Sequence, residues 1–180
     1  MCPPYHHLGS GLLLAQQICT EKAWSVKSSE FSPGTIVATV FGAGYVPIAP
    51  GTAGSLVSAG LFLALRQTVF INSVLCVCFL LLGYWGCCAG RKRWGEDPQK
   101  VVVDEFAGCW IACMAVPAGW GVIGIAAAFV LFRIFDIFKP WPVYVFDRMK
   151  SAAGILLDDV AAGIIAALII LLGSVLHGAL

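Results

Sequence analysis

Acidic side chains gather in one stretch of this chain at spacings that could bind a metal ion. Eight of the ten Asp and Glu residues lie between positions 96 and 159. Asp104 and Glu105 are adjacent, Asp158 and Asp159 form a second adjacent pair, and Asp136 lies between the pairs. Carboxylates that converge from several segments supply the oxygen shell that Mg²⁺ requires. The sequence therefore predicts a Mg²⁺ site made by these five residues.

The same acids also have a simpler explanation. Carboxylates in loops are often solvated charges at the ends of membrane spans, and acids are favoured in the first turn of any helix by its dipole. Against this, both pairs lie where polar sequence gives way to membrane-type sequence, where adjacent uncompensated carboxylates are costly. Both interpretations stay open at this point.

Two cationic residues flank the central acid in the segment FRIFDIFKPWP. Arg133, Asp136 and Lys139 are spaced by three, on a helix that Pro140 is expected to end. This spacing predicts Asp136 as a metal ligand and Arg133 and Lys139 as ligands of phosphate oxygens. The alternative is a span end with an intrahelical ion pair and snorkelling basic side chains.

Another candidate lies in the segment DPQKVVVDEF. Asp97 followed by Pro98 is typical of an N-cap and a first helical position, so we expect a helix to begin there and to place Asp97, Lys100 and Asp104 on one face. Asp97 and Glu105 are the predicted catalytic carboxylates, one of which would orient or deprotonate an attacking water.

A Gly/Pro-rich segment, GAGYVPIAPGTAGSL, runs directly into the first apolar helix. Free backbone N–H groups at a helix N-terminus bind anions, and glycines allow a phosphate to approach closely. Gly51, Thr52 and Gly54 are therefore predicted to bind phosphate. The segment matches neither a Walker loop nor a dinucleotide-binding fingerprint, and a purely structural turn is the alternative.

The elements that must position these residues are apolar. Hydrophobic residues make up 59% of the chain and charged residues 12%, which is typical of a membrane protein. A span takes about 20 helical residues, so 71–89 and 160–178 are long enough alone. The segments 53–65, 105–116 and 119–135 are expected to be short, tilted or re-entrant. We predict an all-α polytopic membrane protein built from helical hairpins, with three to five spans.

Charge predicts the orientation of these hairpins. If 53–65 pairs with 71–89 and 105–116 pairs with 119–135, the long charged loops all lie on one side of the membrane. Ten of the eleven Lys and Arg residues fall on that side, and the exception is Arg66. The positive-inside rule then predicts that the candidate site faces the cytoplasm.

Composition also argues against other classes of partner. The net charge of +1 and the lack of a basic tract with interleaved aromatics argue against nucleic-acid binding. Six of the eight cysteines lie in apolar stretches without neighbouring histidines, so we expect buried free thiols and neither disulfides nor a zinc site. The oligomeric state is left open.

In its motifs the chain resembles the bacterial phosphatidylglycerophosphatase A family. The segments PIAPGTAGSL, DPQKVVVDEFAG, FRIFDIFKPWPV and DRMKSAAGILLDDVAAG stand in that family's order and cover about residues 42–178. Residues 1–41 have no counterpart in this resemblance, so we expect a peripheral or poorly ordered leader before a membrane domain at 42–180.

The resemblance implies a Mg²⁺-dependent phosphomonoesterase that converts phosphatidylglycerophosphate to phosphatidylglycerol at the bacterial inner membrane. The resemblance also implies that the motif residues named above take part in the site. The partners of the protein would be the lipid substrate and the bilayer. A small ion or solute transporter and a non-catalytic membrane scaffold are the alternatives. Clustering of the charges at one end of the spans argues against a transport path.

Overall fold

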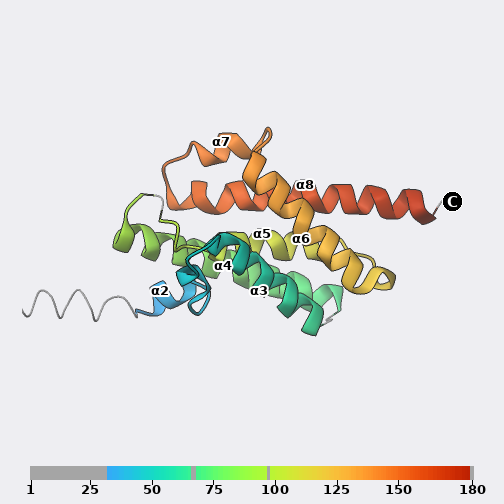
Figure 1. The fold of residues 1–180 in the computed structure, drawn as a ribbon, viewed down its shortest axis with the longest axis horizontal. Helices are drawn as coiled ribbons and strands as arrows, with labels where there is room; N and C mark the ends of the chain where they lie inside the picture. Colours follow the sequence, from blue (N-terminus) through green and yellow to red (C-terminus); the bar gives the residue numbers. More distant parts are fainter. Residues whose placement is uncertain (1–31, 66–67, 97, 179–180) are drawn as a thin grey trace, which may run out of the picture. The chain divides into compact units, whose positions relative to one another are not determined.

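The computed structural model describes residues 32–65, 68–96 and 98–178, and every regular element in these ranges is helical. The elements are α2 (Pro33–Ala38), η2 (Ala43–Tyr45), α3 (Pro50–Leu65), α4 (Val69–Trp94), α5 (Val103–Met114), η3 (Ala118–Trp120), α6 (Gly121–Phe138), α7 (Val143–Asp147) and α8 (Ala152–Gly178) (Figure 1). The predicted all-α class is confirmed, and each predicted apolar segment corresponds to one of the helices α3, α4, α5, α6 and α8.

Three helical stretches are long and apolar enough to cross a membrane: Val69–Trp94, Ala118–Phe138 and Ala152–Leu176. The expectation that only the first and last would suffice was wrong for α6. The apolar stretch includes η3 and continues past Arg133 and Asp136 to Phe138, 21 residues in all. The chain is therefore a membrane protein with three candidate spans.

Local sequence explains where these long helices begin and end. The Thr68 side chain accepts a hydrogen bond from the Ile71 N–H at the start of α4, and Gly95 follows its last turn with a φ of 111° that favours glycine. Lys139 follows α6 with a φ of 46°, and Pro140 cannot continue the helix. The predicted stop before Pro140 is thus observed.

The short helix α5 lies at the centre of the helical bundle. It packs against α3, α4, α6 and α8, and its Trp110 ring is fully buried between Phe62 of α3 and Phe79 of α4, with ring centroids 5.0 and 4.9 Å away. With 12 residues it is about 18 Å long, whereas the hydrocarbon core measures about 30 Å. We therefore treat α5 as an internal helix enclosed by the others and not as a span.

The beginning of α5 differs from the prediction. The helix begins at Val103 and not at Asp97–Pro98. The Val102 N–H donates to the Ala38 carbonyl at 2.9 Å, which fixes the preceding residues against α2 in a non-helical conformation. Lys100 consequently lies outside the helix and does not share a helical face with Asp104. Asp97 itself lies outside the described residues.

The thiols are only partly as expected. The six cysteines of the described ranges are all free, but Cys78 and Cys88 are exposed and Cys76 is half-buried. All three lie on α4, whose outward face is apolar and uncovered by other helices, so their predicted burial was wrong. Cys87, Cys109 and Cys113 are buried as expected.

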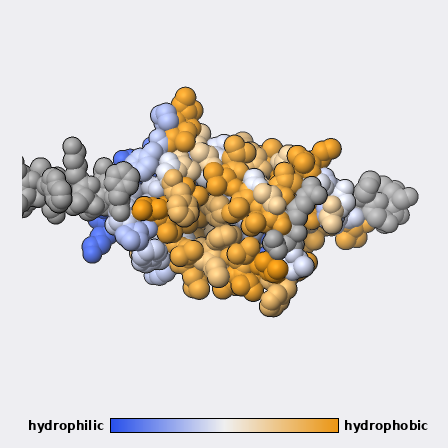
Figure 2. Space-filling model, turned by 90° about the horizontal axis from the view of Figure 1, so that it is seen from below, coloured by the Kyte–Doolittle hydropathy of each residue, from blue (hydrophilic) through white to orange (hydrophobic). Residues whose placement is uncertain are grey.

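Polar and apolar surfaces are separated along the bundle. Figure 2 shows the most hydrophilic residues at one end and hydrophobic residues over most of the rest of this face. In Figure 1 the same end carries the α4–α5 loop, α7 and the beginning of α8. Exposed apolar side chains such as Leu81, Ile123 and Leu172 cover the three long helices, as expected of a surface that meets lipid. The loops between α4 and α5 and between α6 and α8 line one cavity, which confirms the prediction that they lie on the same side.

Candidate active site

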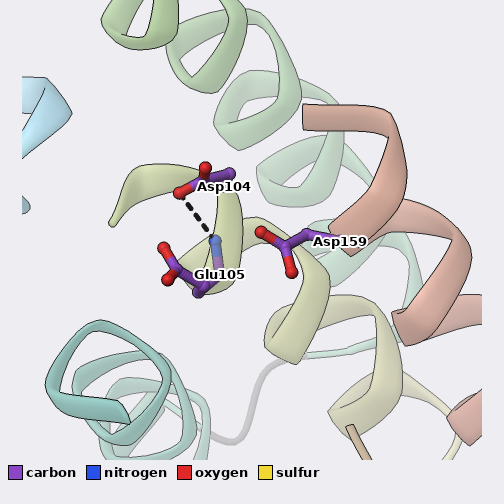
Figure 3. A group of neighbouring side chains, drawn as sticks. All are labelled: Asp104, Glu105 and Asp159. Carbon is purple, nitrogen blue, oxygen red and sulfur yellow. Dashed lines mark hydrogen bonds between the residues drawn. The ribbon is translucent and has the colours of Figure 1, made fainter. Parts of the chain in front are cut away.

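Three carboxylates meet where the beginning of α5 faces α8. Asp104 and Glu105 lie in the first turn of α5, and Asp159 lies on α8 (Figure 3). One oxygen from each of the three lies within 4.8 Å of the other two. Asp104 and Asp159 are only 5% and 4% exposed, so this is a largely buried group of three acids.

Two glycines allow α5 and α8 to approach closely enough for this. A Cβ at Gly163 of α8 would lie 2.3 Å from the carbonyl oxygen of Gly108 of α5, and a Cβ at Gly108 would lie 2.5 Å from the carbonyl oxygen of Asp159. Backbone contacts of this kind require residues without side chains. The glycines therefore set the distance between Asp159 and the α5 carboxylates.

The carboxylate group has oxygens that the described residues leave unsatisfied. Glu105 Oε2 and Asp159 Oδ1 are buried and have no hydrogen-bond partner within the described ranges. The Glu105 N–H donates to Asp104 Oδ1 at 3.0 Å, and the Asp159 N–H donates to Asp158 Oδ1 at the same distance. Unsatisfied buried oxygens in a group of three neighbouring carboxylates fit a cation.

Electrostatics favour the same conclusion. Burial raises the pKa of both Asp104 and Glu105, which makes it costly to keep both ionised. The positive end of the α5 dipole offsets part of that cost. A divalent cation would offset more, and three hard oxygen donors suit Mg²⁺.

Arg133 approaches this group from α6. Its Nη1 lies 2.5 Å from Asp136 Oδ2 and 3.4 Å from Ser55 Oγ of α3. Gly51, in the first turn of α3, makes room for it, because a Cβ there would lie 2.0 Å from Glu105 Oε1 and 3.3 Å from Arg133 Nη1. The first turn of α3, the guanidinium and Glu105 are thus immediate neighbours.

Lys139 reaches the site from the end of α6. Its Nζ donates to Asp158 Oδ2 at 2.9 Å and forms a short hydrogen bond with Asp147 of α7. Partial burial alone would lower the pKa of Lys139, but the two carboxylates raise it above its ordinary value. The ammonium group therefore stays charged at any physiological pH.

The carboxylates described above, Arg133, Lys139 and Gly51 line one cavity of about 640 Å³ at the polar end of the bundle. Its lining includes seven acidic and four basic side chains among the described residues: Glu96, Asp104, Glu105, Asp136, Asp147, Asp158, Asp159, Arg91, Arg133, Lys139 and Lys150. With acids in excess, the cavity would repel a phosphate dianion unless bound cations compensated. The lining is therefore suited to an anionic ligand only together with metal ions.

The structure brings together most of the predicted site, with differences in detail. Asp136 and Asp158 line the cavity but contact Arg133 and Lys139, outside the group of three acids, so a shared five-carboxylate metal site stays a prediction. Gly51 lines the cavity, whereas Thr52 and Gly54 do not. A Cβ at Gly54 would lie 2.8 Å from the Val102 carbonyl oxygen, which indicates a packing role.

Five polar residues of the lining were not singled out from the sequence: Arg91, Glu96, Gln99, Asp147 and Lys150. Asp147 stands in the motif DRMK, and its partner Lys139 is eight positions away, a spacing that no single helix brings together. Arg91 resembles any basic residue at the end of a span. Only the packing of separate loops shows that both face the site.

The fold and the site define a helical membrane protein with a buried carboxylate cluster and phosphate-compatible cations in one cavity. Residues 36–174 match the model of the family described as "PgpA: Phosphatidylglycerophosphatase A". The chain belongs to this family, and it is a phosphatase of lipid metabolism.

Three relatives are similar over most of the chain. A Bacteroides thetaiotaomicron protein, provisionally named phosphatidylinositol-3-phosphatase, is 41% identical over 77% of this chain and 91% of its own length. Proteins named phosphatidylglycerophosphatase A from Escherichia coli and Haemophilus influenzae are each 37% identical. They cover 76% and 80% of this chain and 80% and 90% of their own lengths. No solved structure matches the chain.

Proposed function

We propose that the protein is a Mg²⁺-dependent phosphomonoesterase that converts phosphatidylglycerophosphate to phosphatidylglycerol at the cytoplasmic face of the bacterial inner membrane. The observation that carries the proposal is the group of Asp104, Glu105 and Asp159, whose oxygens converge within 4.8 Å beside Arg133 in one cavity. The names of the Escherichia coli and Haemophilus influenzae relatives support this substrate.

Asp104, Glu105 and Asp159 would hold the metal. When bound, Mg²⁺ supplies positive charge that stabilises the phosphoryl group during transfer. Arg133 and Lys139 bind the remaining phosphate oxygens, and Asp136 and Asp158 hold these two cations in position through the contacts described above. The N–H groups at the beginning of α3 add donors beside Gly51.

The reaction breaks the bond between the terminal phosphorus and its ester oxygen. A water molecule attacks the phosphorus in line with that bond, and the lipid leaves as an alcohol. Asp97, or Glu105 if it is not bound to the metal, accepts the proton of the attacking water.

A second candidate substrate is phosphatidylinositol 3-phosphate, which the name of the 41% identical relative favours. Like phosphatidylglycerophosphate, it carries a phosphomonoester on a polyol head group. The two proposals share one site and one mechanism and differ in the alcohol that leaves.

Phosphate release by the purified full-length protein in detergent micelles tests the proposal. We expect release from phosphatidylglycerophosphate that EDTA abolishes and Mg²⁺ restores, with Ca²⁺ restoring little because Mg²⁺ sites demand shorter and more regular oxygen coordination. A higher kcat/KM for phosphatidylinositol 3-phosphate would favour the second candidate. Activity that resists EDTA would contradict the metal assignment.

A further inference from the structure

The side chains that line the candidate cavity range from buried to exposed. We call the buried part the floor and the exposed part the mouth. Its floor holds Asp104 and Asp159, which are at most 5% exposed. Its mouth holds Glu96 and Lys150, whose side chains are 71% and 82% exposed. The loop after α4 and the loop before α8 carry these exposed residues.

Arg91 is held at this mouth by both loops. Its Nη1 donates to the carbonyl oxygen of Glu96 at 2.8 Å, and its Nη2 donates to the carbonyl oxygen of Lys150 at 3.1 Å. A guanidinium has five N–H donors, so these two bonds leave three. Because the two partners are neutral carbonyl groups, neither bond cancels the positive charge that Arg91 brings to the cavity.

The position of Arg91 along α4 sets its depth in the membrane. It lies in the last turn of a candidate span, at the level where lipid phosphates lie. A basic residue there often serves only to end a span, with its side chain extended outward to the head groups. Arg91 instead reaches across to the α7–α8 loop and lines the cavity, whereas its neighbour Lys92 does not line it.

We propose that Arg91 forms a second phosphate subsite, which binds the phosphodiester of the lipid while the terminal phosphomonoester occupies the floor. This inference rests on the proposed function and deepens it. The substrates it selects are glycerophospholipids whose polyol head group carries a phosphomonoester. Phosphatidylglycerophosphate and phosphatidylinositol 3-phosphate both have this pair of phosphates, and phosphatidic acid lacks the diester.

The test compares wild-type protein with Arg91→Gln, Arg91→Lys and a matched control, Lys92→Gln, which removes one charge from the next position. Each full-length variant hydrolyses phosphatidylglycerophosphate in mixed micelles, and phosphatidic acid is added as a competitive inhibitor. Arg91→Gln should raise the KM for phosphatidylglycerophosphate about 10- to 100-fold with little change in kcat, as expected when a charge-assisted contact is lost. The Ki of phosphatidic acid should stay within about 2-fold, and Lys92→Gln should match wild type.

Arg91→Lys keeps the charge and should recover part of the lost affinity, which separates phosphate binding from mere support of the two loops. Equal rises in the KM and in the Ki for phosphatidic acid, or a fall in kcat alone, would overturn the subsite. An unchanged KM in Arg91→Gln would overturn it as well. Wild-type protein that releases no phosphate from phosphatidylglycerophosphate would overturn the proposed function, an outcome visible before any variant is measured.

Discussion

Asp104, Glu105 and Asp159 are the residues on which the chemistry depends, because three buried carboxylates within 4.8 Å repel one another strongly in a poorly solvated setting. A structure tolerates such a group when a cation compensates it. The same repulsion means that the acids lower the stability of the metal-free protein. Metal ligation and helix capping therefore predict different effects on turnover for substitutions at these positions.

Replacing Asp104 or Asp159 with Asn should lower turnover at least about 100-fold, because each change keeps the side-chain volume and removes a charge needed by the metal. The metal-free variants should be no less stable than wild type, since one repulsive charge is gone. Phosphate release and thermal unfolding, each with and without Mg²⁺, measure both effects. In wild type Mg²⁺ should raise the unfolding temperature, and in the variants it should not.

The capping interpretation makes the contrary prediction. Asp104 lies in the first turn of α5, where Asn is about as favourable as Asp, so its substitution would then be nearly silent. Asp159 lies inside α8, which begins at Ala152, so capping does not apply to it. Wild-type turnover in both variants would remove Asp104 and Asp159 from the metal site and refute the proposed mechanism.

At the residue scale, the sequence predicted the types of group in the site better than their pairings. The acid pairs and Arg133 were identified because their spacing alone points to ligation of metal and phosphate. The contact between Lys139 and Asp147 was not identified from the sequence, because it depends on the turn between α6 and α7. Sequence spacing indicates neighbours within one helix but not across such a turn.

At the scale of elements, the site depends on the contact between α5 and α8. Gly108 and Gly163 bring the two backbones together, and Asp159 lies one helical turn before Gly163 on α8. Any side chain at 163 must push α8 away from α5. The metal-binding oxygens would then separate even though no ligand had changed.

Gly163→Ala should therefore lower kcat/KM at least about 10-fold and weaken Mg²⁺ activation, because displacements near 1 Å at a reacting centre can cost about 100-fold. Gly173→Ala on the same helix is the matched control. A Cβ there meets only Trp120 at 3.8 Å, an ordinary contact, and alanine is the better helix former by about 1 kcal/mol. Steady-state kinetics over a Mg²⁺ titration measures both variants, and equal activity in the two would show that the α5–α8 distance does not govern the site.

The helices themselves were largely predictable, because apolar runs separated by charge and proline define them locally. The first residue of α5 could not be predicted in this way. The Asp97–Pro98 signal favours an earlier start, but the contact of Val102 with Ala38, more than 60 positions away, holds the chain out of the helix. Interactions this distant in sequence override local capping preferences.

At the scale of the whole molecule, the loops that line the cavity all lie at one end of the three candidate spans. The turns at the opposite end are short, and Arg66 is the one basic residue that the sequence places there, whereas ten of the eleven Lys and Arg residues lie outside them. The positive-inside rule then predicts that the cavity faces the cytoplasm. This orientation matters for function, because it decides from which leaflet the lipid enters.

Two introduced cysteines test the orientation in intact cells. Gln99 lies in the α4–α5 loop at the cavity, and Gly119 lies in η3 at the opposite end, where a Cβ meets nothing within 4 Å. Gly119→Cys should react with a membrane-impermeant maleimide added outside, and Gln99→Cys should react only after the membrane is permeabilised. The parent protein supplies the baseline, because Cys78 and Cys88 are exposed on α4 and react slowly where lipid covers them. The reverse pattern, with Gln99→Cys labelled from outside, would place the active site on the external face and exclude the cytoplasmic leaflet as the source of the substrate.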